Sequence, residues 1–230
     1  MSDAGRLPPL HPAARFANRR EAGRALGAMV ARRLGHLAVN RSPLVLALPR
    51  GGVPVASRVA EAVGGDLDLL LVRKISAPGR PELGVGAVAE NGDPIFDDGL
   101  LQRLGLTPAA LTAETAAACT ELARRNAHYR GKRPAPDPAD RLTILVDDGV
   151  ATGCTARAAL RWLRARHAGP ILLAAPVCSR EADHALSTDA DAVICLKRPA
   201  SFTAVAGFYD DFAQLTDADV HRHLLVRVTS

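Results

Sequence analysis

The stretch that decides the fold is ILVDDGVATGCT, at residues 144–155. Its apolar start is what a buried parallel strand needs, and Asp147 and Asp148 follow where the carboxyl end of that strand should lie. Glycines and threonines come next, and the chain then becomes rich in Ala and Leu, which favours a helix. A strand, a Gly/Thr turn and a helix N-terminus together predict an anion site, because backbone N–H groups and the helix dipole both favour negative charge there.

The two adjacent carboxylates need a partner other than a phosphate, because like charges repel each other. Sugar hydroxyls and a divalent cation are the natural candidates. This order of strand, acid pair and Thr-Gly-x-Thr resembles the phosphoribosyl-pyrophosphate (PRPP) motif of the type I phosphoribosyltransferases. The resemblance implies that Asp147 and Asp148 hold the ribose hydroxyls, and that the 5′-phosphate is held by Ala151, Thr152, Gly153, Cys154 and Thr155. The alternative is an ordinary turn followed by a helix, with two solvated aspartates.

The composition suits one α/β domain spanning residues 1–230, with 48% hydrophobic residues available for a core. We expect a mostly parallel, twisted sheet flanked by helices, of the Rossmann-like kind that the resemblance implies. The expected core covers residues from about 40 to 198. A helical insertion at about residues 97–135 and a small C-terminal hood at about residues 199–230 complete the expected architecture.

The formal net charge is +5, but no block of arginines alternates with aromatic residues as a nucleic-acid groove requires. No run is long and apolar enough to span a membrane, and residues 1–12 lack the apolar core of a signal peptide. The four cysteines show no CxxC spacing, so neither a zinc site nor a disulfide framework is predicted. We therefore expect a cytoplasmic protein with small-molecule substrates, and neither nucleic acid nor a membrane as its partner.

A second motif follows the apolar run at residues 44–48, which predicts a strand buried on both faces. The next residues are Pro49, Arg50, Gly51 and Gly52, and glycines at this point permit close approach of the backbone to a ligand. In the family, the pyrophosphate loop lies here and has an unusual, often cis, peptide bond. The resemblance implies that Arg50, Gly51 and Gly52 contact pyrophosphate, whereas the alternative is a plain turn between strand and helix.

The apolar run at residues 67–72 predicts another buried strand. Arg73 and Lys74 would lie at its carboxyl end, where ligands bind in open α/β sheets. The resemblance implies a contact between Lys74 and the pyrophosphate of PRPP, and a solvated pair of charges is the alternative.

Residues 75–93 are rich in Gly and Pro and predict a loop followed by a strand at residues 85–89. A turn at Asn91 and Gly92 and a short return strand near Ile95 should follow. Glu82 and Glu90, in this segment, are either active-site carboxylates or solvated charges.

Helices are predicted at residues 97–104 and 108–129, the second with Thr107 as its cap. The basic, Pro-rich segment at residues 128–138 predicts a solvated connector. The alternative is that it forms part of a mobile loop closing over PRPP, in which residues 130–133 would meet the pyrophosphate charge.

The C-terminal tail holds three of the five phenylalanines and one of the two tyrosines, and it ends in a predicted helix at residues 217–225. In the family this region is the hood that binds the nucleobase, so Phe208 and Tyr209 are candidates for stacking on a flat base. A packed lid is the alternative.

The resemblance implies a Mg²⁺-dependent transfer of ribose 5-phosphate from PRPP to a nitrogen acceptor, with Mg²⁺ carried by the pyrophosphate. Enzymes for 6-oxopurines have an aspartate at the position of Ala151 and a lysine at that of Ser201, so hypoxanthine and guanine are unfavoured acceptors. A non-enzymatic module that binds PRPP or a nucleotide is the competing function. The oligomeric state stays open, with a homodimer as one option.

Overall fold

The computed structural model describes residues 15–35, 41–90, 92–131 and 133–225. Its main sheet has five parallel strands in the order β2-β1-β6-β7-β8. These strands are β1 (Leu44–Ala47), β2 (Asp66–Leu69), β6 (Thr143–Val146), β7 (Ile171–Val177) and β8 (Ala192–Lys197). Because β6 lies in the centre, the residues that follow it are flanked by the ends of β1 and β7. The predicted mostly parallel sheet is confirmed.

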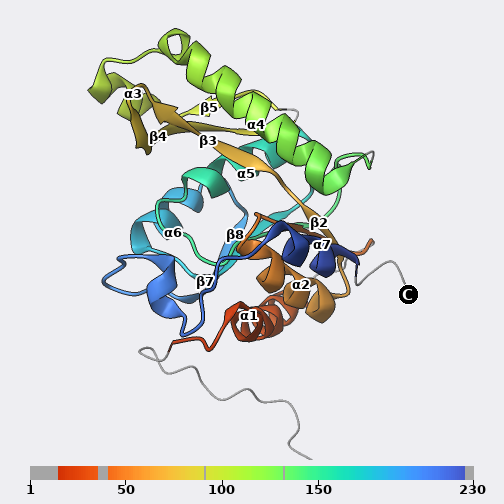
Figure 1. Cartoon of the computed structure of the whole chain (residues 1–230). Helices are drawn as coiled ribbons and strands as arrows, with labels where there is room; N and C mark the ends of the chain where they lie inside the picture. The colour runs from red at the N-terminus through yellow and green to blue at the C-terminus, as the bar shows by residue number, and fades with distance from the viewer. Residues whose placement is uncertain (1–14, 36–40, 91, 132, 226–230) are drawn as a thin grey trace, which may run out of the picture.

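Helices cover both faces of this sheet (Figure 1). They are α1 (Arg19–Leu34), α2 (Gly52–Val63), α5 (Cys154–Ala165), α6 (Arg180–Leu186) and α7 (Asp217–Leu225). Successive side chains of β6 point to opposite faces. Ile144 and Val146 pack in one hydrophobic core with Leu26 of α1, whereas Leu145 packs in another with Leu160 of α5. Both faces are therefore buried, which explains why the apolar run is continuous rather than alternating.

Local signals set the ends of several helices. The side chain of Asn18 accepts a hydrogen bond from the Glu21 N–H at 3.0 Å and caps α1. Gly64 ends α2 in the left-handed conformation, with φ of 63°. Thr107 caps the short helix η1 (Pro108–Leu111), which continues into α4 (Thr112–Arg130), and α3 (Asp98–Leu104) precedes them. Among the described residues, no helix combines the length and the apolar character that crossing a membrane requires.

A second sheet is antiparallel and has the order β3-β4-β5. Its strands are β3 (Val72–Ala77), β4 (Arg80–Ala89) and β5 (Ile95–Phe96). The prediction that one strand over residues 67–72 ends on Arg73 and Lys74 is therefore wrong, because both cations lie within β3. The predicted loop after residue 75 is also wrong, since β3 and β4 form a hairpin there, whereas the return strand at Ile95 is confirmed. The predicted turn residue Asn91 lies outside the described residues.

The chain changes from one sheet to the other at Leu70 and Leu71. The Leu70 N–H still donates to the carbonyl of Ala47 in β1, at 3.0 Å. The Leu71 carbonyl instead accepts from the N–H of Glu90, directly after β4, also at 3.0 Å. Both leucines are buried, so the apolar run continues through the change of partner and its pattern conceals the break.

The helical insertion lies over the antiparallel sheet, with α4 running along it (Figure 1). Arg130, the last residue of α4, is buried and donates to both carboxylate oxygens of Glu90, at 3.0 and 2.9 Å. It also donates to Asp68 of β2 at 2.8 Å. Arg130 is thus part of a buried ion pair rather than of a mobile loop, and Glu90 is neither solvated nor free to act on a ligand. The side chain of Glu82 lies outside the described residues.

Candidate active site

The acid pair, Asp147 and Asp148, meets the loop that follows the neighbouring strand β1. Parallel strands present their carboxyl ends at one edge, and the Leu48 N–H continues the pairing by donating to the Val146 carbonyl at 2.9 Å. The peptide bond between Pro49 and Arg50 in this loop is cis. A first cavity of about 420 Å³ opens between loop and acid pair, lined by Arg19, Pro49, Arg50, Gly51, Asp147, Asp148, Phe212, Gln214 and Leu215.

The loop can approach the acid pair this closely because Gly51 and Gly52 lack side chains. A Cβ atom at Gly51 would lie 2.0 Å from Oδ2 of Asp148. A Cβ atom at Gly52 would lie 2.6 Å from the carbonyl oxygen of Val146. Both distances are far below van der Waals contact, so each position needs glycine for space rather than for an unusual φ.

The environment of the acid pair disfavours full ionisation. Burial raises the pKa of Asp147 well above its ordinary value, and the negative charge of Asp148 raises it further. Burial also raises the pKa of Asp148, although the hydrogen bond and positive charge of Arg19 oppose this shift. The two carboxyls interact and therefore titrate as a pair. A ligand that donates hydroxyl groups or develops positive charge here stabilises the doubly ionised form.

Arg19, which no sequence pattern singled out, contacts the acid pair. Its Nε donates to Oδ2 of Asp148 at 2.7 Å, and its Nη1 donates to the Ala213 carbonyl at 3.0 Å. Its guanidinium carbon lies 3.7 Å from the centroid of the Phe212 ring. Arg19 is 129 positions from Asp148 in the chain, so only the folded structure brings the two together.

Residues 151–155, which we call the phosphate turn after their predicted ligand, link the acid pair to the N-terminus of α5. Gly153 has φ of 75° and stands directly before the helix. Ser179 after β7 holds the turn from the other side, since its Oγ donates to the Ala151 carbonyl at 2.6 Å and its N–H donates to the Val150 carbonyl at 2.9 Å. The first N–H groups of a helix have no acceptor within the helix, so this end of α5 can bind an anion.

A second cavity, of about 410 Å³, lies between α5 and the antiparallel sheet. It brings Lys74 together with Thr152 and Cys154 of the phosphate turn and with Arg157 of α5. Burial raises the pKa of the Cys154 thiol, which favours its neutral form. The opposite wall is mostly apolar and is formed by Leu83, Gly84, Gly86, Ala87, Ile95, Phe96 and Leu100, together with one acid, Asp97. Lys74 therefore lines the cavity at the phosphate turn, whereas Arg50 lines the cavity at the acid pair.

The predicted stacking role of Tyr209 is wrong for this structure. Tyr209 is 1% exposed, and its ring packs against those of Phe16 and Phe212. Its hydroxyl donates to the backbone carbonyl of Asp148 at 2.5 Å, so it supports the acid pair from within the core. Phe208 packs against Phe202 and is not among the residues that line either cavity. From the aromatic cluster, Phe212 is the residue that reaches the first cavity.

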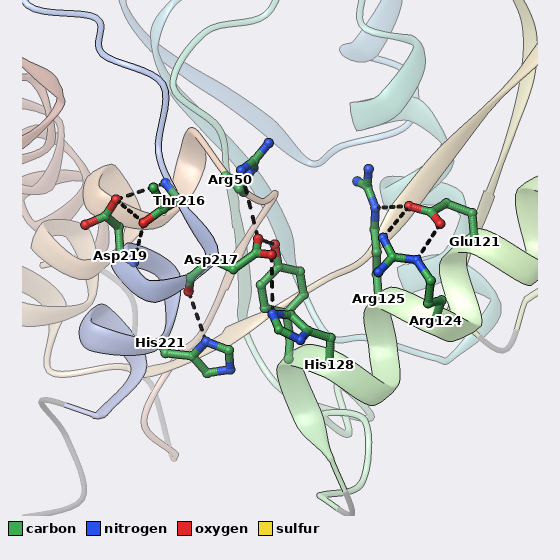
Figure 2. A network of polar contacts seen from close by, with 10 residues as sticks. Arg50, Glu121, Arg124, Arg125, His128, Thr216, Asp217, Asp219 and His221 are labelled. Atoms are coloured by element: carbon green, nitrogen blue, oxygen red, sulfur yellow. Dashed lines mark hydrogen bonds and ion pairs between the residues drawn. The ribbon is translucent and has the colours of Figure 1, made fainter.

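Arg50 also contacts a polar network between the insertion and the hood (Figure 2). Asp217, the first residue of α7, accepts a hydrogen bond from the Tyr129 hydroxyl of α4. One Asp217 carboxylate oxygen lies 3.3 Å from Nε2 of His128 and the other lies 4.0 Å from Nη1 of Arg50. The sequence-predicted cation, Arg50, therefore lines the first cavity and lies at the outer limit of ion-pair distance from an acid of the hood.

Within the described residues, no group of three or more His, Cys, Asp or Glu side chains is arranged to hold a metal ion. Mg²⁺, however, usually binds through one or two carboxylates together with substrate phosphates, and keeps several waters. Asp147 and Asp148, which line the same cavity as the exposed Arg50, supply carboxylates of this kind. The residues present fit a Mg²⁺ ion that arrives with a polyphosphate ligand.

Comparison with known proteins places the chain in a family. Residues 14–213 match the model of the phosphoribosyl transferase domain. Two Mycobacterium tuberculosis proteins, from strains CDC 1551 and H37Rv, are provisionally named phosphoribosyl transferases. Each is 40% identical to this chain over 205 residues, and the match covers 89% of this chain and 45% of the relative. The chain thus spans less than half the length of these relatives. The crystal structure of the protein TT1426 from Thermus thermophilus is similar with a TM-score of 0.78 and 41% identity, covering 92% of this chain and 98% of that one. The chain belongs to the phosphoribosyl transferase family.

Proposed function

We propose that this chain transfers the ribose 5-phosphate of PRPP to a nitrogen acceptor and releases pyrophosphate. The observation that carries the proposal is the junction of the acid pair with the Arg50 loop at neighbouring strand ends. One cavity there offers carboxylates for ribose hydroxyls and a cation for pyrophosphate, and the phosphate turn follows within the same loop after β6.

In this mechanism the leaving pyrophosphate departs from C1 of the ribose, and positive charge develops on the sugar ring. Asp147 and Asp148 accept hydrogen bonds from the ribose hydroxyls and stabilise that positive charge electrostatically. Arg50 and the N–H groups of its loop contact the departing pyrophosphate. Mg²⁺, bound with PRPP, supplies additional positive charge at the pyrophosphate.

Lys74 is better suited to the 5′-phosphate than to pyrophosphate, which changes the role implied by the sequence. It lines the cavity of the phosphate turn, with Thr152 and Arg157, and not the cavity of Arg50. Two cations beside a helix N-terminus favour a doubly charged phosphate. The rest of that cavity is mostly apolar, so the phosphate would occupy only its polar end.

The acceptor is not a 6-oxopurine in this proposal. Ala151 begins the phosphate turn with an exposed methyl group, so no carboxylate is available there as a base at a purine ring. Ser201, also exposed, cannot donate a charged hydrogen bond to a 6-oxo group as a lysine can. Bases without that oxo group and small amines are the acceptors to screen.

The test is a screen for PRPP consumption and pyrophosphate release in the presence of Mg²⁺, against a panel of bases and small amines. We expect one acceptor class to release pyrophosphate at a rate well above that of the acceptor-free control. Tight PRPP binding without release from any acceptor would favour a regulatory or accessory module that binds PRPP. Absence of both binding and release would reject the proposed function.

Asp148→Asn provides the matched site variant, because it keeps the shape of the side chain and removes its charge. Asp93→Asn is its control, because Asp93 is exposed and lines neither cavity. We expect the first variant to lose pyrophosphate release by about 100-fold, the size expected for removing one electrostatic stabiliser. The control should retain the wild-type rate.

A further inference from the structure

One wall of the first cavity comes from the hood and consists of Phe212, Gln214 and Leu215, which we call the hood wall. It belongs to the segment at residues 211–216, which forms neither helix nor strand. A segment of this kind has no ladder of backbone hydrogen bonds to fix it, so its position depends on the contacts at its two ends.

The first end of the segment is held by residues near the start of α1. The Asp211 N–H donates to the Ala17 carbonyl at 2.9 Å. Arg19 donates through Nη1 to the Ala213 carbonyl at 3.0 Å, and its guanidinium carbon lies 3.7 Å from the centroid of the Phe212 ring. These contacts extend to Ala213, and the rest of the hood wall depends on the other end of the segment.

The second end of the segment is held by the helical insertion. Asp217 directly follows the segment, and one oxygen of its carboxylate accepts a hydrogen bond from the Tyr129 hydroxyl of α4. The other oxygen lies 3.3 Å from Nε2 of His128. Figure 2 shows this carboxylate between His128 and Arg50, whose Nη1 is 4.0 Å away. One side chain of the hood thus lies between α4 and the loop of the first cavity.

Tyr129 is well placed to act as an anchor. It is 7% exposed and belongs to the larger hydrophobic core. Its ring packs against those of His128 and His221, with centroids 5.2 and 5.7 Å away. Burial, together with the hydrogen bond to Asp217, raises the pKa of Tyr129 to about 12, so its hydroxyl is a donor at neutral pH. A hydrogen bond to a charged acceptor is stronger than one between neutral groups, so the core position of Tyr129 restrains Asp217.

The carboxylate of Asp217 is not needed to start α7. Thr216 and Asp219 already form a capping box, in which the Thr216 N–H donates to Oδ2 of Asp219 at 2.9 Å and the Asp219 N–H donates to Oγ1 of Thr216 at 3.2 Å. Val220 of the same helix is 1% exposed and packs in the larger core. Helix α7 therefore keeps its start and its core contact without the bond between Tyr129 and Asp217, and the effect of losing that bond should be confined to the hood wall.

We propose that Tyr129 is a positioning residue that fixes the hood wall through Asp217 and thereby sets the affinity of the first cavity for PRPP. This inference rests on the proposed function, and it gives the helical insertion a part in that site. The role is indirect, because Tyr129 is not among the residues that line either cavity.

Tyr129→Phe tests the inference, because it removes the hydroxyl and keeps the ring in the core. We expect PRPP, titrated calorimetrically with Mg²⁺, to bind about 2- to 30-fold more weakly, the range typical of residues that influence a site without touching its ligand. In the background of Asp217→Ala the same change should have no effect, because the two residues act through one bond. Arg222→Met is the matched control on α7, since its ion pair with Asp219 is exposed, and it should keep the wild-type affinity.

The methyl NMR signals of Leu215, assigned by their loss in Leu215→Met, report the position of the hood wall without PRPP. They should shift in Tyr129→Phe and in Asp217→Ala, and stay in place in Arg222→Met. Asp217→Asn should return them most of the way toward the wild-type position, because it keeps an acceptor for the Tyr129 hydroxyl.

A merely structural role would lower the melting temperature of Tyr129→Phe and leave its affinity for PRPP at the wild-type value, which would overturn the inference. Unchanged Leu215 signals in Tyr129→Phe would overturn it as well, and so would an equal loss of affinity with and without Asp217. Wild-type protein that binds no PRPP would reject the proposed function, whereas the Leu215 signals would still decide whether Tyr129 positions the hood wall.

Discussion

Replacing Arg130 with methionine should destabilise the protein strongly. The Arg130 and Glu90 side chains are 2% and 1% exposed, and two hydrogen bonds of 3.0 and 2.9 Å join them. Arg130 also donates to Asp68 and to the carbonyl of Leu69, so it connects the end of α4 with both sheets. Methionine keeps part of the apolar stem but leaves the Glu90 carboxylate buried without its cation.

The expected cost is about 3–5 kcal/mol in the free energy of unfolding, the usual penalty for breaking a buried pair from one side. For a chain of this size that is a decrease of roughly 6–20 °C in melting temperature. Urea denaturation followed by circular dichroism measures the free energy. Arg124→Met is the control on the same helix, because the ion pair of Arg124 with Glu121 is exposed to water and its loss should leave the free energy of unfolding nearly unchanged (Figure 2).

The double variant Arg130→Met with Glu90→Leu should recover much of the loss, because it replaces the buried charges by apolar groups. Asp68 keeps its contact with water, since its side chain is 24% exposed. The expected coupling energy between Arg130 and Glu90 is about 2–3 kcal/mol. A loss below about 1 kcal/mol for Arg130→Met, or strictly additive effects of the two changes, would refute the reasoning.

Three further predictions concern the site. Gly51→Ala should cost about 1–3 kcal/mol of stability and weaken PRPP binding, because its Cβ atom would lie 2.0 Å from Asp148. Gly207→Ala is the control, because the space around Gly207 is open, and it should be neutral in the same denaturation and binding assays. The wild type should lose stability between pH 5 and pH 8, because the pKa of Asp147 is raised in the folded protein above its value in the unfolded chain. Asp147→Asn should lack this loss, and equal pH profiles of melting temperature for the two proteins would contradict the prediction. Tyr209→Phe should lose about 1 kcal/mol of stability, measured in urea, and weaken PRPP binding, since it removes the donor to the Asp148 carbonyl; wild-type affinity would exclude that supporting role.

Features of the fold that depend on neighbouring residues could be predicted from the sequence. The strand at residues 144–146, the acid pair and the helix after the turn form one continuous segment, and each part has a local signature. The loop after β1 also has a local signature, since its glycines predict close approach of the backbone to a ligand. That Gly51 lies against Asp148 is seen only in the structure. Parallel pairing of β1 with β6 then brings the two segments together.

The misplaced elements depend on contacts between distant residues. The apolar character of Leu70 and Leu71 is the same in either sheet, so hydrophobicity could not show where the chain leaves β1 for β4. The pattern predicts Lys74 at the end of a strand, and the family resemblance implies a contact with pyrophosphate. In the structure Lys74 lies within β3 and lines the cavity at the phosphate turn. The scarcity of aromatic residues suggests a ligand contact for Tyr209, but its ring fills a core with Phe16.

The central claim is that the acid pair beside the Arg50 loop binds PRPP. Isothermal titration of PRPP with Mg²⁺ into wild-type protein, and into the variant with both Asp147→Asn and Asp148→Asn, tests it most directly. The account predicts saturable binding to the wild type and at least a tenfold weaker affinity in the variant. A loss of about 1.4 kcal/mol in contacts with the ribose is enough for that tenfold change. Equal affinities of the two folded proteins, or no binding to the wild type, would contradict it.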